Sequence, residues 1–162
     1  MKLFFFITSV FLSLQTLNIK EVRLAFKEAG QNDAKIEAFY NSLDTVKKTD
    51  NVVLVAYKGA ATAMMAKTKK TIKEKKEGFI KGVELVEYAI NKAPNNIEAR
   101  FIRFGIQENT PKLLKYKANM EEDKYFILNQ FNTIKDTYLK SHIKEYILQS
   151  NAFSKEEKNN IK

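Results

Sequence analysis

Apolar residues recur every three or four positions along most of this chain, which is the spacing of one face of an α-helix. The clearest stripe comprises Ile72, Phe79, Val83, Val86, Ile90 and Ala93. A second stripe comprises Ile36, Phe39, Tyr40, Leu43 and Val46, with Asp33 as the expected helix cap. A shorter helix is predicted from Ile19 to Ala29, with Gly30 as its left-handed stop. The sequence therefore predicts an all-α fold.

The segment after Asp50 admits two interpretations. Its first residues, Val52 to Val55, are rich in β-branched side chains and on their own would suit a strand. The apolar run continues without a break through Tyr57 into Gly59 and a series of alanines and methionines. We therefore predict one buried helix here, whose small residues allow a neighbouring helix to approach closely.

Two prolines divide the second half of the chain. Pro94, followed by two asparagines, is expected to turn the chain into a helix from Ile97 to Glu108, and Pro111 is expected to end that helix. The residues expected to pack through a loop or short turn after it are Leu113, Leu114 and Tyr116.

Cap residues mark the remaining helix starts. Asn119, with Glu122 three residues later, resembles a capping box, and Asp136 can open the next helix. Ser154 with Glu157 is expected to start a short polar turn that frays. The apolar positions after the first two starts are Met120, Ile127, Phe131, Ile134 and Tyr138, then Leu139, Ile143, Tyr146 and Ile147. Since no linker rich in Pro, Gly or Ser interrupts residues 17–162, we predict one domain, an antiparallel bundle of helix hairpins.

Residues 1–16 carry the pattern of a secretory signal peptide. Lys2 precedes an apolar run from Leu3 to Leu14. This run is shorter than the roughly 20 residues of a transmembrane helix. We expect cleavage to leave a mature chain that begins near residues 15–18, lacks a transmembrane helix and is periplasmic or secreted. An uncleaved N-terminal anchor and a buried first helix stay open as alternatives.

Composition narrows the possible chemistry. The chain has no cysteine and one histidine, His142, which excludes disulfides, thiolate catalysis and paired-histidine metal sites. We expect no cofactor and no metal, and a partly exposed His142 within a helix. The net charge of +9 suits an anionic partner. Nucleic acid is not favoured, because tandem arginines, a glycine-rich RNA-binding signature and a base-stacking pattern are all missing from the sequence.

Lysines gather between Lys67 and Lys81, at the predicted start of a helix. Lys69, Lys73 and Lys76 are candidates for binding an anionic partner. The alternative is a solvated helix face, because lysines and glutamates in this run stand four residues apart, as they do on exposed helices.

Only three of the 28 lysines and arginines are arginines, and two of these, Arg100 and Arg103, lie in the helix after Pro94. A guanidinium is planar and binds a carboxylate or phosphate through two hydrogen bonds at once, which an ammonium cannot do. Arg100, Arg103 and Gln107 share one helix stripe. With Tyr116 they form a candidate clamp for an anion.

This clamp has a structural alternative. Glu98 and Asp123, or exposed helix-end carbonyls, can bind the two arginines and so fix the connection around Pro111. If Asp123 neutralises an arginine, the clamp hypothesis weakens. The carboxylates of the chain form no recognisable acid pair, so we expect no catalytic residues.

One helix and the turn after it resemble part of a tetratricopeptide repeat. The matching residues are Gly82, Val86, Ala89 and Pro94, followed by Asn95-Asn96 and a new helix. Ala66, Lys70 and Arg100 stand where that family has its glycine and bulky aromatic residues, and no second copy of the repeat is visible. The resemblance implies tetratricopeptide-like packing of helix hairpins, without the peptide-binding groove of that family.

A longer stretch, residues 54–135, resembles a group of exported α-helical proteins from Bacteroidota whose activity is unknown. The matching positions are Tyr57, Gly59, Ala60, the Ala93–Asn96 turn, Glu98, Arg100, Phe101, Arg103, Gln107, Pro111, Tyr116, Asp123 and Lys124. This resemblance implies an exported helical domain and contributes no activity.

The residues favour a non-catalytic protein–protein interaction or scaffold domain, whose partner is expected to be another envelope protein. The alternative is a binder of a small anionic ligand or envelope lipid, with a pocket beneath the small-residue helix from Gly59 to Ala66. A closed pocket lined by Met64, Met65 and Phe79 would favour the ligand binder. A shallow groove with unpaired arginines would favour the protein partner.

Overall fold

The structure, a computed structural model, describes residues 17–161, so the expected signal peptide lies outside the described residues. Within that range the chain has eight α-helices, four short 3₁₀ turns and no strand. The α-helices are α1 (Ile19–Gln31), α2 (Ile36–Ser42), α3 (Val52–Met65), α4 (Ile72–Lys92), α5 (Ile97–Asn109), α6 (Met120–Gln130), α7 (Thr137–Gln149) and α8 (Lys155–Asn159). The predicted all-α fold is confirmed.

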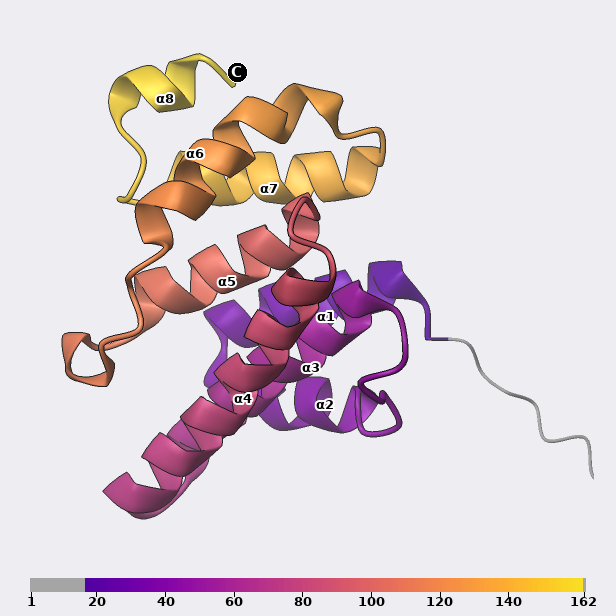
Figure 1. Cartoon of the computed structure of the whole chain (residues 1–162), viewed down its shortest axis with the longest axis vertical. Helices are drawn as coiled ribbons and strands as arrows, with labels where there is room; N and C mark the ends of the chain where they lie inside the picture. Colours follow the sequence, from indigo (N-terminus) through magenta and orange to yellow (C-terminus); the bar gives the residue numbers. More distant parts are fainter. Residues whose placement is uncertain (1–16, 162) are drawn as a thin grey trace, which may run out of the picture.

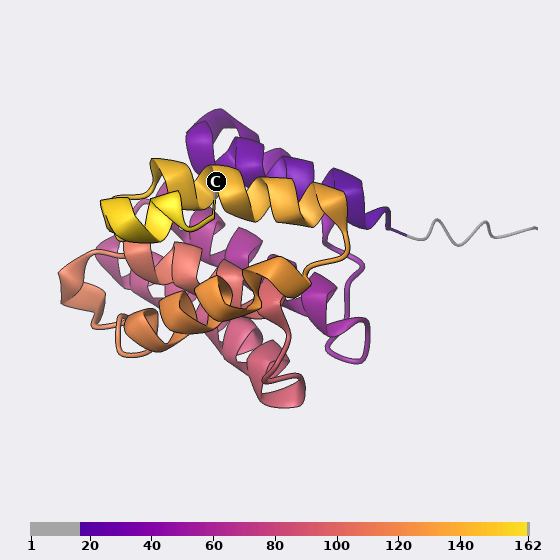
Figure 2. The same ribbon diagram turned by 90° about the horizontal axis from the view of Figure 1, so that it is seen from above.

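Helix α5 is the central element of the arrangement (Figure 1). In this view α1 to α4 lie below it and α6, α7 and α8 above it. It packs directly against α3, α4 and α6. Seen from above, α7 runs beside α1 (Figure 2), where Lys27 and Glu145 form an ion pair between the two helices. Side chains on α5 therefore reach partners from both halves of the chain.

Helices α3 and α4 cross with their backbones in contact. A Cβ added at Gly82 would lie 2.5 Å from the backbone nitrogen of Ala63 and 2.6 Å from the carbonyl oxygen of Gly59. Such distances leave no room for a side chain at this crossing. The predicted close approach of small residues is confirmed, and Val52 to Val55 are helical rather than a strand.

Several of the predicted helix starts are present. Ser154 and Glu157 form a complete capping box at α8, each side chain accepting a hydrogen bond from the other residue's backbone nitrogen. Asp136 caps α7 in the same way with its side chain. The chain turns after Pro94, and Asn96 caps α5.

Three details of the predicted helix termini are wrong. Gly30 lies inside α1, because the chain leaves the helical conformation only at Asn32. The side chain of Asn32, not of Asp33, caps the 3₁₀ turn that follows. Asn119 makes no cap hydrogen bond to α6, since its amide nitrogen donates to the side chain of Glu122 instead.

Most of the predicted apolar stripes are buried, but three residues that were expected to pack are exposed, Tyr138 at 36% and two others far more fully. Ile72 is 83% exposed and Leu113 is 85% exposed. Ile72 opens α4 ahead of the crossing with α3, and Leu113 lies in the 3₁₀ turn Lys112–Leu114, which follows the end of α5. Neither position has a helix packed over it.

His142 is also misplaced by the sequence analysis. It is only 7% exposed, and its ring packs against Phe26 and Phe101.

Among residues 17–161, none of the helices combines the length and the apolar composition that crossing a bilayer requires.

Candidate functional site

Arg103 is buried and bound to carboxylates. Its Nε and one terminal nitrogen donate to the two oxygens of Asp123 at 2.6 and 2.8 Å, and its other terminal nitrogen donates to Glu87 at 2.9 Å. The Arg103 side chain is 5% exposed and that of Asp123 is 0% exposed. Tyr116 donates its hydroxyl to the second oxygen of Glu87. This cluster joins α4, α5 and α6.

Arg100, one turn earlier on α5, is also bound within the molecule. Its Nε donates to the carbonyl oxygen of Pro94 at 2.7 Å. One terminal nitrogen donates to Glu122 at 2.7 Å and to Asp123 at 3.0 Å. The guanidinium lies over the ring of Phe126, 4.5 Å from its centre. Arg100 therefore fixes the turn before α5 to the start of α6.

These contacts match the structural alternative for the two arginines. Asp123 neutralises both of them, which is the condition that weakens the anion clamp. Burial raises the pKa of Tyr116, and its hydrogen bond to Glu87 raises that pKa further, so the phenol stays protonated and keeps donating. Gln107 is 1% exposed, and its amide nitrogen and oxygen have no hydrogen-bond partner within the described residues.

The third arginine, Arg23 on α1, makes an equally complete site that the sequence analysis missed. Its Nε and one terminal nitrogen donate to the two oxygens of Glu98 on α5, both at 2.7 Å. Its remaining terminal nitrogen donates to Asp136 at 2.7 Å, and Tyr57 donates its hydroxyl to Glu98 at 2.8 Å. The sequence could have indicated this site, because Arg23, like Arg100 and Arg103, is one of the few arginines in a lysine-rich chain.

Neither of these buried clusters has the make-up of a metal or acid–base site. Among the described residues, no group of three or more His, Cys, Asp or Glu side chains is placed to hold a metal ion. Glu98 and Asp123 are each bound by an arginine through both oxygens. Burial lowers the pKa of His142, as does the nearby Lys27. The clusters are therefore interpreted as supports for the fold.

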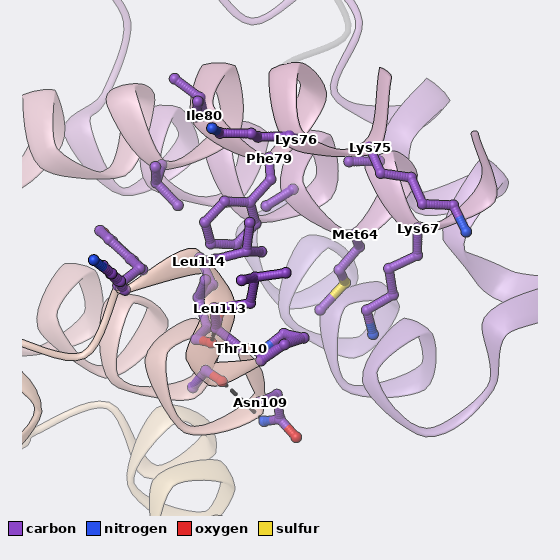
Figure 3. A pocket seen from close by; sticks show the side chains of 18 of the residues that line it. Met64, Lys67, Lys75, Lys76, Phe79, Ile80, Asn109, Thr110, Leu113 and Leu114 are labelled. Atoms are coloured by element: carbon purple, nitrogen blue, oxygen red, sulfur yellow. Dashed lines mark hydrogen bonds between the residues drawn. The ribbon is translucent and has the colours of Figure 1, made fainter. Parts of the chain in front are cut away.

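A groove of about 1040 Å³ lies between α4 and the segment that joins α5 to α6. Met64 and Phe79 form one wall, and Leu113 and Leu114 extend from the other wall toward them (Figure 3). The groove reaches inward as far as Phe26 of α1, a buried core residue. Its volume lies at the upper end of the usual range for small-molecule sites, about 300–1000 Å³.

The interior of the groove is apolar in character. Two uncharged polar residues from the end of α5 make hydrogen bonds within that helix, because Asn109 donates one amide hydrogen to the carbonyl of Gly105 and Thr110 donates its hydroxyl to that of Ile106. The hydroxyl of Tyr116 donates to Glu87. Most of the lining that remains for a ligand to contact is apolar.

Charge enters only at the edge of the groove. The lining includes Lys67, Lys75, Lys76 and Lys115 and no aspartate or glutamate. Within residues 17–161 these four lysines, called the rim lysines below, form no ion pair and no side-chain hydrogen bond. The groove therefore has an apolar interior and an edge of lysines whose positive charge no carboxylate in the lining balances.

Of the three lysines suggested by sequence, only Lys76 lines this groove. Lys69 lies in the exposed connection before α4, and Lys73 points away to an ion pair with Glu77 at 4.0 Å. Met64 and Phe79 line the groove as expected for a ligand pocket, whereas Met65 does not.

No protein-family model, curated protein or solved structure matches this chain.

Proposed function

We propose that this protein is a non-catalytic binder of an anionic amphiphile, whose apolar chain enters the groove while its carboxylate or phosphate head lies among the rim lysines. The single observation that carries this proposal is the lining itself. It is apolar from Phe26 outward and carries four lysines but no carboxylate at its edge. Apolar burial supplies most of the affinity, and the lysines select the charged head.

A slender chain suits the groove better than a folded partner does. The deepest lining residues belong to the core, so an occupant has to pass between helices to reach them. An aliphatic chain needs no hydrogen bonds, and the hydroxyls of Thr110 and Tyr116 in the lining already donate within the protein. Both features support a ligand with one saturated chain.

The expectation of a protein–protein interaction or scaffold domain stays a prediction. Of its two expected surfaces, the Lys67–Lys81 face keeps its lysines exposed, but the stripe of Arg100 and Arg103 is bound to carboxylates inside the molecule. This favours the ligand binder. Export to the periplasm or the exterior, after removal of residues 1–16, belongs to the proposal because envelope lipids are the nearest source of such amphiphiles.

The contact of Gly59 with Gly82 supports tetratricopeptide-like hairpin packing, which also stays a prediction.

Displacement of a fluorescent anionic probe, 1-anilinonaphthalene-8-sulfonate, by decanoate and by decanol tests this function. The variant Lys67→Ala/Lys76→Ala removes two rim lysines, and Lys69→Ala/Lys73→Ala removes two lysines outside the groove. Both variants lose the same net charge, so they differ only in position.

We expect decanoate to bind the wild type and the Lys69→Ala/Lys73→Ala variant alike. The Lys67→Ala/Lys76→Ala variant should bind it roughly tenfold more weakly, because two cation–anion contacts at a partly exposed site are lost. Decanol should bind all three proteins with similar affinity. Absence of decanoate binding, or equal losses in the two variants, would contradict the proposed function.

A further inference from the structure

Two exposed apolar side chains stand at the mouth of the groove. Ile72 opens α4 and Leu113 lies in the turn after α5, and both line the groove while being more than four-fifths exposed, at 83% and 85%. They lie 41 positions apart in the sequence. Large aliphatic residues displayed together on opposite sides of one opening mark an interaction surface.

Local hydrogen bonds fix the backbone at both positions. Thr71 and Glu74 form a complete capping box, which fixes the helix start at Ile72. On the other side, backbone hydrogen bonds from Leu114 to Pro111 and from Lys115 to Lys112 close the turn that displays Leu113.

Lys115 adopts a left-handed conformation with φ of 50°. It is the only non-glycine residue with positive φ in the described part of the chain. This conformation is unfavourable for a lysine, and the hydrogen bonds of the turn hold the backbone there.

The surface around these two residues is strongly cationic. The four rim lysines flank them, and Lys69, Lys70 and Lys112 lie beside them in sequence. Of the nearest carboxylates on α4, Glu77 forms an ion pair with Lys73, and Glu74 accepts hydrogen bonds from Thr71 and interacts electrostatically with Lys69. The mouth therefore combines exposed aliphatic groups with a surface on which lysines outnumber the nearby carboxylates.

We propose that Ile72, Leu113 and the rim lysines form a surface that docks on an anionic lipid bilayer, with the two aliphatic side chains inserted among the lipid head groups. Charge complementarity selects the bilayer, because lysines close to an anionic membrane are attracted by its negative surface potential. Insertion of two aliphatic side chains adds apolar burial in the interface. An acidic protein surface could pair with the lysines, but it would offer no apolar layer into which the two aliphatic side chains could insert.

This docking deepens the proposed function, since it places the mouth of the groove against the membrane from which an amphiphile would enter. Only this link between docking and entry of the amphiphile rests on the proposed function. The docking surface itself is defined by exposed residues and is measured without any groove ligand.

Sedimentation with vesicles tests the docking. The purified protein, with its N-terminus recorded by intact-mass spectrometry, is mixed with vesicles of phosphatidylcholine containing 30% phosphatidylglycerol and with vesicles of phosphatidylcholine alone. The variants are Ile72→Ser/Leu113→Ser and, as the matched control, Tyr125→Ser, which removes an exposed aromatic residue from α6 outside the groove.

We expect binding to the anionic vesicles that weakens as salt is raised, and little binding to the neutral ones. The Ile72→Ser/Leu113→Ser variant should bind at least about tenfold more weakly, and Tyr125→Ser should bind like the wild type. Equal binding by the two variants would overturn the proposal. So would binding of an acidic amphipathic peptide by the same residues without binding of vesicles.

The two proposals fail separately. Loss of vesicle binding with retained binding of decanoate in vesicle-free solution removes the docking surface and leaves the groove ligand. Vesicle binding without any binding of decanoate removes the proposed function and leaves a membrane-docking surface alone.

Discussion

Arg103 on α5 and Asp123 on α6 form a two-point ion pair, with donor–acceptor distances of 2.6 and 2.8 Å, in which the Asp123 side chain is fully buried. Removing or weakening one partner of such a pair leaves the other desolvated without full compensation. This relationship explains why a chain dominated by lysine carries an arginine at this position.

Arg103→Lys should therefore destabilise the protein. Lysine keeps the charge but cannot make the paired hydrogen bonds to Asp123, and the loss of one charge-assisted bond costs about 1.5–3 kcal/mol. The free energy of unfolding in urea checks this, with Lys69→Ala as the control at an exposed lysine. Equal stabilities of the two variants would mean that the arginine is not required there.

Arg23 and Glu98 provide an independent test of the same idea on the other side of α5. Arg23→Met leaves Glu98 buried without its cation and should cost about 3–5 kcal/mol. Tyr57→Phe removes one hydrogen bond to Glu98 and keeps the ion pair, so it should cost only about 1 kcal/mol. Chemical denaturation of both variants measures the difference, and a larger loss in Tyr57→Phe than in Arg23→Met would refute this ranking.

Gly82→Ala tests the crossing of α3 and α4. The added methyl group would overlap the backbones of Gly59 and Ala63, at 2.6 and 2.5 Å, so the helices would have to separate. We expect a loss of at least about 2 kcal/mol in unfolding free energy.

Gly30→Ala is the matched control for that substitution. A Cβ at Gly30 meets nothing within 4 Å, and the residue is helical. Its stability should stay the same or rise by up to about 1 kcal/mol, since alanine favours a helix more than glycine does. Similar losses in both variants would argue against a tight crossing.

His142 should make the fold sensitive to mild acid. Burial lowers its pKa below the ordinary value of 6.5, and the cations of Lys27 and Arg23 lower it further, against the opposing carboxylates Glu145 and Glu98. The unfolded chain then takes up a proton at higher pH than the folded one. The contribution of His142 to stability is complete above about pH 6.5 and is lost as pH falls toward its folded-state pKa.

Unfolding free energies measured at pH 7.5 and pH 5 check this prediction. The wild type should lose more stability between these two values than His142→Phe, whose ring can keep the contacts with Phe26 and Phe101. The carboxylates with lowered pKa, such as Asp136 and Glu145, lose their contributions only in more acidic solution. An identical loss in the two proteins would show that His142 does not titrate on unfolding.

The helices were predictable because their signals are local. Caps such as Asp136 and the box of Ser154 with Glu157 act within one turn, and apolar spacing identifies each buried face without knowledge of its partner. The exceptions have a common origin. His142, Ile72 and Leu113 were misjudged because their exposure depends on which helix lies across from them, and helical periodicity does not contain that information.

The candidate site shows the same limit. Unusual arginines among many lysines did identify Arg100 and Arg103 as special, but the carboxylates that bind them come from α4 and α6. The groove is built from segments that are distant in sequence, so of its lining residues only Met64, Phe79, Lys76 and Tyr116 were singled out for binding beforehand. Its charge pattern emerges only when α4 and the turn after α5 are placed side by side.

The groove ligand can be tested most directly by NMR of the methionine methyl groups. Met64 lines the groove, whereas Met65 and Met120 do not, and they serve as internal controls in the same sample. On titration with decanoate we predict that the Met64 methyl resonance shifts and saturates while the other two stay nearly in place. Unchanged Met64, or equal shifts of all three methyl groups, would contradict a ligand in this groove.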